Sequence, residues 1–163
     1  MQLLKENDPR LRVVSTEWDF IVDGDPEPIV LMLGRIMMEN NALGLSSPQC
    51  GTAKRIFVMG NADKFKVCIN PQILYGFDTC RDIEGCLSFP NLWLTVPRYR
   101  EILVRYWNMK GEVREEKLQG LEARVFQHEL DHLDGILFDT KVGPASLDWA
   151  KQKRKKKLRH SFD

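Results

Sequence analysis

The chain of 163 residues is long enough for one domain with a well-buried core and too short for two. Its composition, 43% hydrophobic and 29% charged, is ordinary for a soluble globular protein. No apolar run is long enough to span a membrane, and residues 1–10 lack the apolar centre of a signal peptide. We therefore predict a cytoplasmic location and no membrane partner. Four irregularly spaced cysteines argue against a secreted disulfide scaffold.

The formal net charge of +1 conceals an uneven distribution of charge along the chain. Residues 151–163 contain seven Lys and Arg and one Asp, whereas the other 150 residues contain 17 basic and 22 acidic side chains. A block of like charges is usually solvated or serves as an interaction tail. We predict a folded domain over residues 1–145, followed by a separate basic C-terminal helix or tail over residues 146–163.

The first 50 residues predict an arm, a helix and a loop. Residues 3–12 are predicted to form an extended arm with a turn at Asn7–Pro9. Asp25 can cap a helix and Pro26 suits a first helical turn, and the helix is expected to end by Asn40. The small residues at 42–49 predict a connecting loop. The apolar stripe of the helix consists of Ile29, Leu33, Ile36 and Met37.

Strand patterns dominate the middle of the chain. Residues 54–59 and 66–69 predict two strands, and residues 72–75 predict another extended piece. Residues 98–107 alternate between apolar and polar side chains, and residues 112–118 are expected to pair back on them. The strands cluster before the next helix instead of alternating with helices. This order predicts the α+β class, with antiparallel sheets packed around that central helix and a further helix at the C-terminus.

The central helix is predicted between Gly120 and Gly135, because glycine suits the left-handed position beyond a helix end. Leu121 and Val125 share one face with His128 and His132, so they would line any cavity beside these histidines. That lining suggests an apolar substrate side chain. A second stripe is also apolar, which predicts a helix buried in the middle of the domain. This stripe consists of Ala123, Phe126, Leu130 and Leu133.

The helix contains His-Glu-x-x-His at residues 128–132. Two histidines four residues apart project from one helical face and can share a metal ion. Glu129 lies next to that face, where it can take a proton from metal-bound water. The alternative is a helix whose two histidines merely pack or face solvent.

A catalytic metal site usually has three protein ligands and an open position, so a third ligand is needed. His160 lies in the basic tail and is expected to be solvated. Cys86 is the better candidate, because a thiolate is a strong ligand for a soft or borderline metal and the neighbouring Gly85 permits close approach. The other cysteines are expected to be small buried or incidental residues; they are Cys50, Cys68 and Cys80.

These stretches together resemble the signature motifs of the peptide deformylase family, and the resemblance covers about residues 3–140. Residues 84–88, Glu-Gly-Cys-Leu-Ser, resemble the second motif, and residues 127–135 resemble the third. The first family motif, G-x-G-L-A-A-x-Q, is matched at Gly44, Leu45 and Gln49. The chain departs from it by small-for-small changes, which should preserve the tight loop. The departures are Ala42, Ser46 and Ser47.

The resemblance implies removal of the formyl group from N-formylmethionyl peptides with release of formate. It implies one divalent metal held by Cys86, His128 and His132, with iron (Fe²⁺) expected and zinc, nickel or cobalt as possible substitutes. Metal-bound water would attack the formyl carbon, with Glu129 as general base and then general acid. By motif position, the side-chain amide of Gln49 and the backbone N–H of Leu87 would stabilise the oxyanion.

The resemblance also implies a set of substrate contacts. An alternative for two of them, Glu84 and Arg98, is a structural ion pair that only braces the loop. The expected substrate contacts are Leu43, Gly44, Glu84, Gly85, Arg98 and Val125.

The basic end of the chain has two interpretations. Ser146 can cap a helix with few apolar positions, at Leu147, Ala150 and Leu158, so a solvated helix end is one reading. The resemblance implies the other, in which a basic helix binds ribosomal phosphate near the exit of nascent chains. We expect a monomer.

Three other functions share some of these features. A metallopeptidase usually has a third His or Glu in place of Cys86. A catalytically dead binding module would tolerate loss of Glu129 or Gln49, and neither is lost. A structural zinc protein would usually supply a fourth ligand and close the site. The motifs therefore favour a deformylase.

Overall fold

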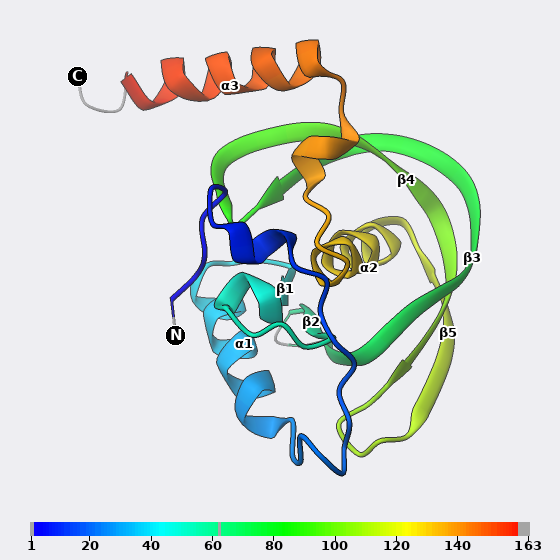
Figure 1. Cartoon of the computed structure of the whole chain (residues 1–163). Coiled ribbons are helices and arrows are strands. Elements are labelled where there is room, and N and C mark those ends of the chain that lie inside the picture. Colours follow the sequence, from blue (N-terminus) through cyan, green and yellow to red (C-terminus); the bar gives the residue numbers. More distant parts are fainter. Residues whose placement is uncertain (1, 62, 160–163) are drawn as a thin grey trace.

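The computed structural model describes residues 2–61 and 63–159. These residues form five antiparallel strands in one sheet, in the order β1-β2-β3-β4-β5, together with three α-helices (Figure 1). The α+β prediction is confirmed, with one continuous sheet in place of the several predicted. The strands are β1 (Gly44–Ser46), β2 (Ile56–Gly60), β3 (Phe65–Cys86), β4 (Phe89–Trp107) and β5 (Val113–Gln119). The helices are α1 (Glu27–Glu39), α2 (Gly120–Leu133) and α3 (Pro144–Arg159), with 3-10 turns η1 (Pro9–Arg12), η2 (Ser47–Cys50) and η3 (Phe138–Lys141).

Strands β3 and β4 are much longer than the sequence predicts, with 22 and 19 residues. They curve around α2 as one long antiparallel pair, joined by a turn at Leu87 and Ser88 (Figure 1). In the sequence, Asn70 and Pro71 look like a break between two strands. In the structure they fall within a shift of the β3–β4 register between Ile69 and Gln72. Such bulges bend a strand without ending it, and they accommodate proline. The prediction of short, separate strands in this part of the chain is therefore wrong.

Helix α2 lies in the middle of the domain, as predicted (Figure 1). Its Ala123 and Phe126 are wholly buried against the sheet, and the rings of Phe126 and Phe57 meet edge to face at 5.1 Å. Both flanking glycines have positive φ, 58° at Gly120 and 68° at Gly135. A Cβ at Gly135 would lie 2.5 Å from the carbonyl oxygen of Arg12, so the end of α2 packs directly on the N-terminal arm.

The first 50 residues follow the prediction in part. Helix α1 begins at Glu27, whose backbone N–H donates to the Asp25 side chain at 2.9 Å. The arm contains the short turn η1. The predicted loop over 42–49 is wrong, because it contains β1 and η2. Strand β1 forms through pairing with Phe57–Met59, a contact between segments that local sequence does not reveal.

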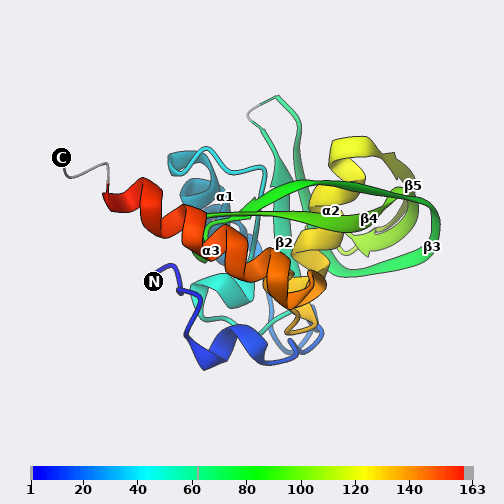
Figure 2. The same cartoon turned by 90° about the horizontal axis from the view of Figure 1, so that it is seen from above.

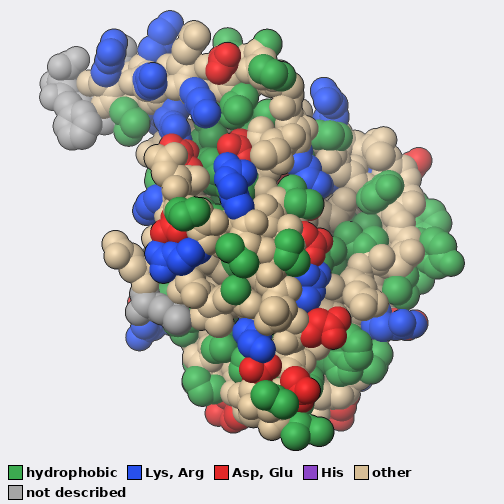
Figure 3. All heavy atoms as spheres, viewed as in Figure 1, with side chains coloured by type: hydrophobic (Ala, Val, Ile, Leu, Met, Phe, Trp, Pro, Cys, Tyr) green, Lys and Arg blue, Asp and Glu red, His purple; other side chains and the backbone are tan. Residues whose placement is uncertain are grey.

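Helix α3 begins at Pro144, so Ser146 is not its cap. Ala150 is buried and Leu147 partly buried against the cluster that contains Phe89 and Phe138, while Arg154 pairs with Glu6 at 2.9 Å. The rest of the helix projects beyond the domain (Figures 1 and 2), and Lys and Arg side chains cover it (Figure 3). Residues 160–163, which include His160, lie outside the described residues. Within residues 2–61 and 63–159, no helix has the length and apolar character needed to cross a bilayer.

Candidate metal centre and cavity

Three side chains from two elements converge beside α2. Cys86 is the last residue of β3, at the tip of the β3–β4 pair, and His128 and His132 lie one turn apart on α2. Their ligand atoms all lie within 4.8 Å of one another. The Cys86 Sγ is 3.3 Å from the His132 Nε2, and the rings of His128 and His132 are 5.0 Å apart. The structure therefore brings together the three predicted ligands.

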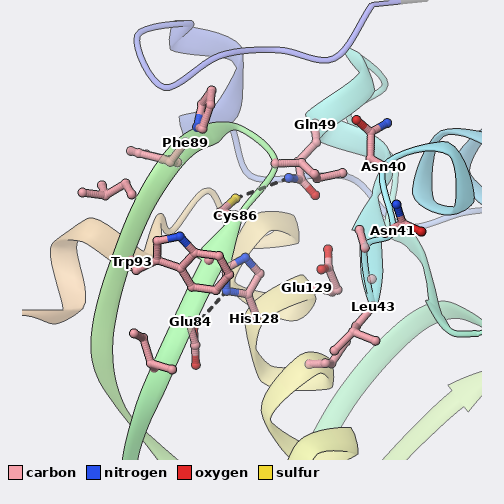
Figure 4. A pocket seen from close by; sticks show the side chains of 18 of the residues that line it. Asn40, Asn41, Leu43, Gln49, Glu84, Cys86, Phe89, Trp93, His128 and Glu129 are labelled. Atoms are coloured by element: carbon pink, nitrogen blue, oxygen red, sulfur yellow. Dashed lines mark hydrogen bonds and ion pairs between the residues drawn. The ribbon is translucent and has the colours of Figure 1, made fainter. Parts of the chain in front are cut away.

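A buried network orients His128. Its Nδ1 lies 2.9 Å from the Glu84 Oε2, which leaves Nε2 as the nitrogen able to bind a metal (Figure 4). Glu84 also accepts hydrogen bonds from Arg98 at 2.9 and 3.0 Å and from Arg124 at 2.7 Å. Burial raises the pKa of Glu84, but hydrogen bonds from His128 and Arg98 outweigh burial and lower that pKa to about 2. Arg98 also contacts Asp131.

The chemistry of these residues fits a divalent metal. One thiol and two imidazoles supply three protein ligands, the number found in catalytic sites that keep a fourth position open. Burial lowers the pKa of His132 well below its usual value, so this imidazole stays neutral and able to bind. For His128, burial lowers the pKa, but hydrogen bonds with Cys86 and Glu84 raise it to about 10. A metal would therefore bind His128 in place of a proton.

Glu129 lies beside the cluster and faces the same cavity. Its Oε2 is buried and has no hydrogen-bond partner among residues 2–61 and 63–159. Burial is the main reason that the pKa of Glu129 is raised to about 7. A buried carboxylate with an unpartnered oxygen and a pKa near neutrality has the properties of a general base.

Gln49 lies across the cavity from α2, on η2 (Figure 4). Its Nε2 donates to the Ser88 Oγ at 3.2 Å and to the Cys86 Sγ at 3.5 Å. Leu87 follows Cys86 in the turn and also lines the cavity. The amide N–H₂ group is therefore directed to the same place as the three ligand atoms.

The cavity has a volume of about 560 Å³. Of the predicted substrate contacts, five line it, while Arg98 is buried behind Glu84 and pairs with it. Leu121 lies on the lining together with Val125, as its place on the helix predicts. The predicted contacts on the lining are Leu43, Gly44, Glu84, Gly85 and Val125.

The other cysteines lie apart from this cluster. Cys50 and Cys68 are buried, which raises the pKa of the Cys50 thiol to about 11 and also raises that of Cys68. Cys80 is half-buried, and its Sγ lies 3.5 Å from the Arg124 guanidinium. The burial of Cys50 and Cys68 confirms the prediction for these two residues, while the incidental role of Cys80 stays a prediction.

Comparison with known proteins decides the family. The family model of polypeptide deformylase matches residues 1–146. The chain belongs to this family. A peptide deformylase from Pseudothermotoga lettingae is 40% identical over 149 residues, 90% of this chain and 85% of the relative. One from Thermotoga petrophila is 42% identical over 125 residues, 76% of each chain. The structure of a peptide deformylase from Synechococcus elongatus in complex with actinonin has a TM-score of 0.88 at 31% identity, over 94% of this chain and 85% of that one.

Membership in the deformylase family establishes the activity. The chain is a metal-dependent hydrolase that removes the N-formyl group from the N-terminal methionine of nascent polypeptides. Its substrates are formyl peptides, and the Cys-His-His cluster is its metal site. The deformylase interpretation of the sequence is thus confirmed over a metallopeptidase, a binding module or a structural zinc protein.

The structure adds residues around this deformylase site that sequence reasoning missed. Arg124 is buried, lines the cavity and pairs with Glu84. Its position four residues before His128 places it on the histidine face of α2, which is the signal that could have revealed it. Trp93 covers Gly85, where a Cβ would lie 2.9 Å from the indole. Sequence gives no signal for this contact, because it depends on the register of β3 and β4.

Proposed function

We propose that Glu129 is the general base and general acid of the deformylation reaction. The observation that carries this proposal is that Glu129 lines the cavity beside the three ligands and that its buried Oε2 has no partner among the described residues. Glu129 would accept the proton of the attacking water and deliver it to the departing amine. The metal, when bound by Cys86, His128 and His132, supplies Lewis acidity and lowers the pKa of water so that hydroxide is available near neutral pH.

The formyl oxygen gains negative charge as the water attacks, and it needs donors placed in advance. We propose that the Gln49 amide and the Leu87 backbone N–H supply them. The direction of the Gln49 Nε2 toward Cys86 supports this role. Leu43, Gly44, Gly85 and Val125 would bind the methionine side chain in the cavity, while Glu84 and Arg98 would hold His128 and its surroundings in place.

We further propose Fe²⁺ as the physiological metal, with zinc, nickel or cobalt as substitutes. One thiolate and two imidazoles suit all four ions. The assignment is testable by metal analysis of protein prepared without oxygen, which should contain about one iron per chain. Zinc as the bound metal in such a preparation, with full activity, would contradict it.

The substitution Glu129→Gln tests the proposed base, because it keeps the size of the side chain and removes its proton chemistry. We expect formate release from a formyl-Met peptide to fall about 10²- to 10⁴-fold with the metal content unchanged. The matched control is Glu122→Gln, on the exposed side of the same helix. Activity of the Glu129 variant within about tenfold of the parent, with metal bound, would exclude this role.

We also propose that residues 146–163 form a basic segment separate from the catalytic domain at residues 1–145, and that this segment binds the ribosome in the cytoplasm. The support is the charge of α3 and the small part of it that packs on the domain (Figure 3). Phosphate binding by such a helix would concentrate the enzyme, a monomer, near its substrate. The competing role is a solvated helix end.

Truncation after Ala150 separates these two roles. If the segment binds ribosomes, co-sedimentation should weaken on truncation, and that of the full chain should fall steeply with rising salt. Turnover of a formyl dipeptide is the internal control and should stay nearly intact. Unchanged co-sedimentation after truncation would identify a solvated helix end.

A further inference from the structure

Two serines hold the two ends of the Gln49 side-chain amide. Ser46, the last residue of β1, is wholly buried. Its backbone N–H and its hydroxyl donate to the Gln49 Oε1 at 3.0 and 2.9 Å. At the other end, the Gln49 Nε2 donates to the hydroxyl of Ser88 at 3.2 Å. Ser46 is also one of the positions at which the chain departs from the family motif, which has alanine there.

The orientation of a carboxamide matters because its oxygen and nitrogen ends have almost the same shape and opposite polarity. If the Gln49 amide turned over, its oxygen would face the cavity, where it would repel the negative charge that develops on the formyl oxygen. The Ser46 backbone N–H can only donate, so it requires the carbonyl oxygen of the amide, and the hydroxyl adds a second hydrogen bond to that oxygen. The orientation that satisfies Ser46 is therefore the one that directs N–H₂ toward Cys86 (Figure 4).

The simpler interpretation is that Ser46 only begins the turn η2. The two residues form a capping box, in which the Ser46 side chain accepts from the Gln49 backbone N–H and the Gln49 side chain accepts from the Ser46 backbone N–H, so the hydroxyl also supports the turn. The hydroxyl is a second donor to that oxygen, and its nearness to Glu129 lowers the pKa of this carboxyl. Ser47 gives the contrast, because it is equally buried and its hydroxyl donates to the Lys54 carbonyl at 2.5 Å.

We propose that Ser46 is a positioning residue of the deformylation reaction, whose hydroxyl holds the Gln49 amide with its N–H₂ group toward the reacting formyl oxygen. This inference rests on the proposed role of Gln49 as a donor to that oxygen. It assigns to Ser46 an effect on the rate of the reaction, exerted through Gln49, with no contact between Ser46 and the substrate.

The test is a cycle of three variants, Ser46→Ala, Gln49→Ala and the double variant, each loaded with metal. Alanine occupies the position of Ser46 in the family motif, so Ser46→Ala is expected to fold. Loss of one of two donors to Gln49 should lower kcat about three- to tenfold, with KM and metal content unchanged. In the Gln49→Ala background the same substitution should change kcat less than about twofold, because the group that Ser46 positions is already absent.

Ser47→Ala is the matched control, and it should lower the melting temperature while leaving kcat unchanged. A parent-like kcat in Ser46→Ala, with Gln49→Ala impaired, would overturn the inference and leave the proposed role of Gln49 intact. An equal loss in both backgrounds would also overturn it, because Ser46 would then act through Glu129 or through packing. A parent-like kcat in Gln49→Ala would overturn the role of Gln49, and the role of Ser46 with it.

Discussion

The substitution Gly44→Ala tests whether the position of Glu129 is critical. Gly44 lies in β1 against α2, and a Cβ at this position would be 2.6 Å from the Glu129 Oε1 and 2.9 Å from a methyl carbon of Val125. Ordinary contact begins at 3.4 Å, so the carboxylate oxygen must move by about 0.8 Å. The backbone of Gly44 is not among the positive-φ residues, so alanine meets no conformational strain there.

A displacement of this size is large for a catalytic group. Misplacement by about 1 Å can cost about 10² in rate, so we expect kcat/KM for a formyl-Met peptide to fall between about tenfold and a hundredfold. Metal content should not change, because the Gly44 Cβ would meet Glu129 and Val125 and none of the three ligands. Overpacking should also lower the free energy of unfolding by about 1–3 kcal/mol. The assays are formate release, metal analysis and urea unfolding.

Two glycines serve as controls. A Cβ at Gly76 would lie 2.4 Å from the Tyr99 ring, on the β3–β4 pair and outside the cavity lining, so Gly76→Ala reproduces a close contact without moving Glu129. A Cβ at Gly143 would meet nothing within 4 Å. Neither control should lower kcat/KM. If Gly44→Ala stays within threefold of the parent, or if Gly76→Ala loses as much activity, the reasoning about Glu129 is refuted.

Three further predictions concern the metal and its surroundings. Cys86→Ser should lose metal on dialysis against a mild chelator, while Cys50→Ser and Cys80→Ser should retain it; equal retention would contradict Cys86 as a ligand. Because the pKa of Glu84 is lowered from 4.5 to about 2 in the folded state, Glu84 stabilises the fold above pH 4.5, and this contribution is lost between pH 4.5 and 2. Urea unfolding at pH 6 and pH 3 should show that the parent loses up to about 2 kcal/mol more than Glu84→Gln. The iron form should lose activity in air faster than the nickel form, and equal half-lives would exclude oxidation at the metal or at Cys86.

The parts of the site that follow from local spacing could be predicted from sequence. The four-residue interval between His128 and His132 defines a helical face, and the same face predicts that Leu121 and Val125 line the cavity. Cys86 follows from chemistry, because the site needs a third ligand that can bind beside two imidazoles. The burial of α2 follows from its two apolar stripes.

The parts that depend on pairing between distant segments could not be predicted. Strand β1 exists because Gly44–Ser46 pair with Phe57–Met59, and its three residues carry no strand pattern of their own. The length of β3 is hidden by bulges, one of which contains Pro71. The contacts of Ser46 with Gln49 and Glu129 depend on the same pairing, since β1 is the strand that faces α2 across the cavity.

The geometry of the metal centre depends on two spacings that nearly match, one along strand β3 and one along helix α2. Glu84 and Cys86 lie two residues apart on β3, about 6.6 Å in an extended strand, and both line the cavity although the pairing with β4 shifts between Gly85 and Cys86. His128 and His132 lie four residues apart on α2, separated along the helix axis by about 6 Å.

Because these two intervals nearly match, two cross-contacts form side by side. Glu84 meets His128 at 2.9 Å, and Cys86 meets His132 at 3.3 Å. One strand therefore supplies a metal ligand and also the carboxylate that orients a second ligand. A shift of one residue in the strand would turn both side chains to the opposite face, so the third ligand and the orientation of His128 depend on the same register.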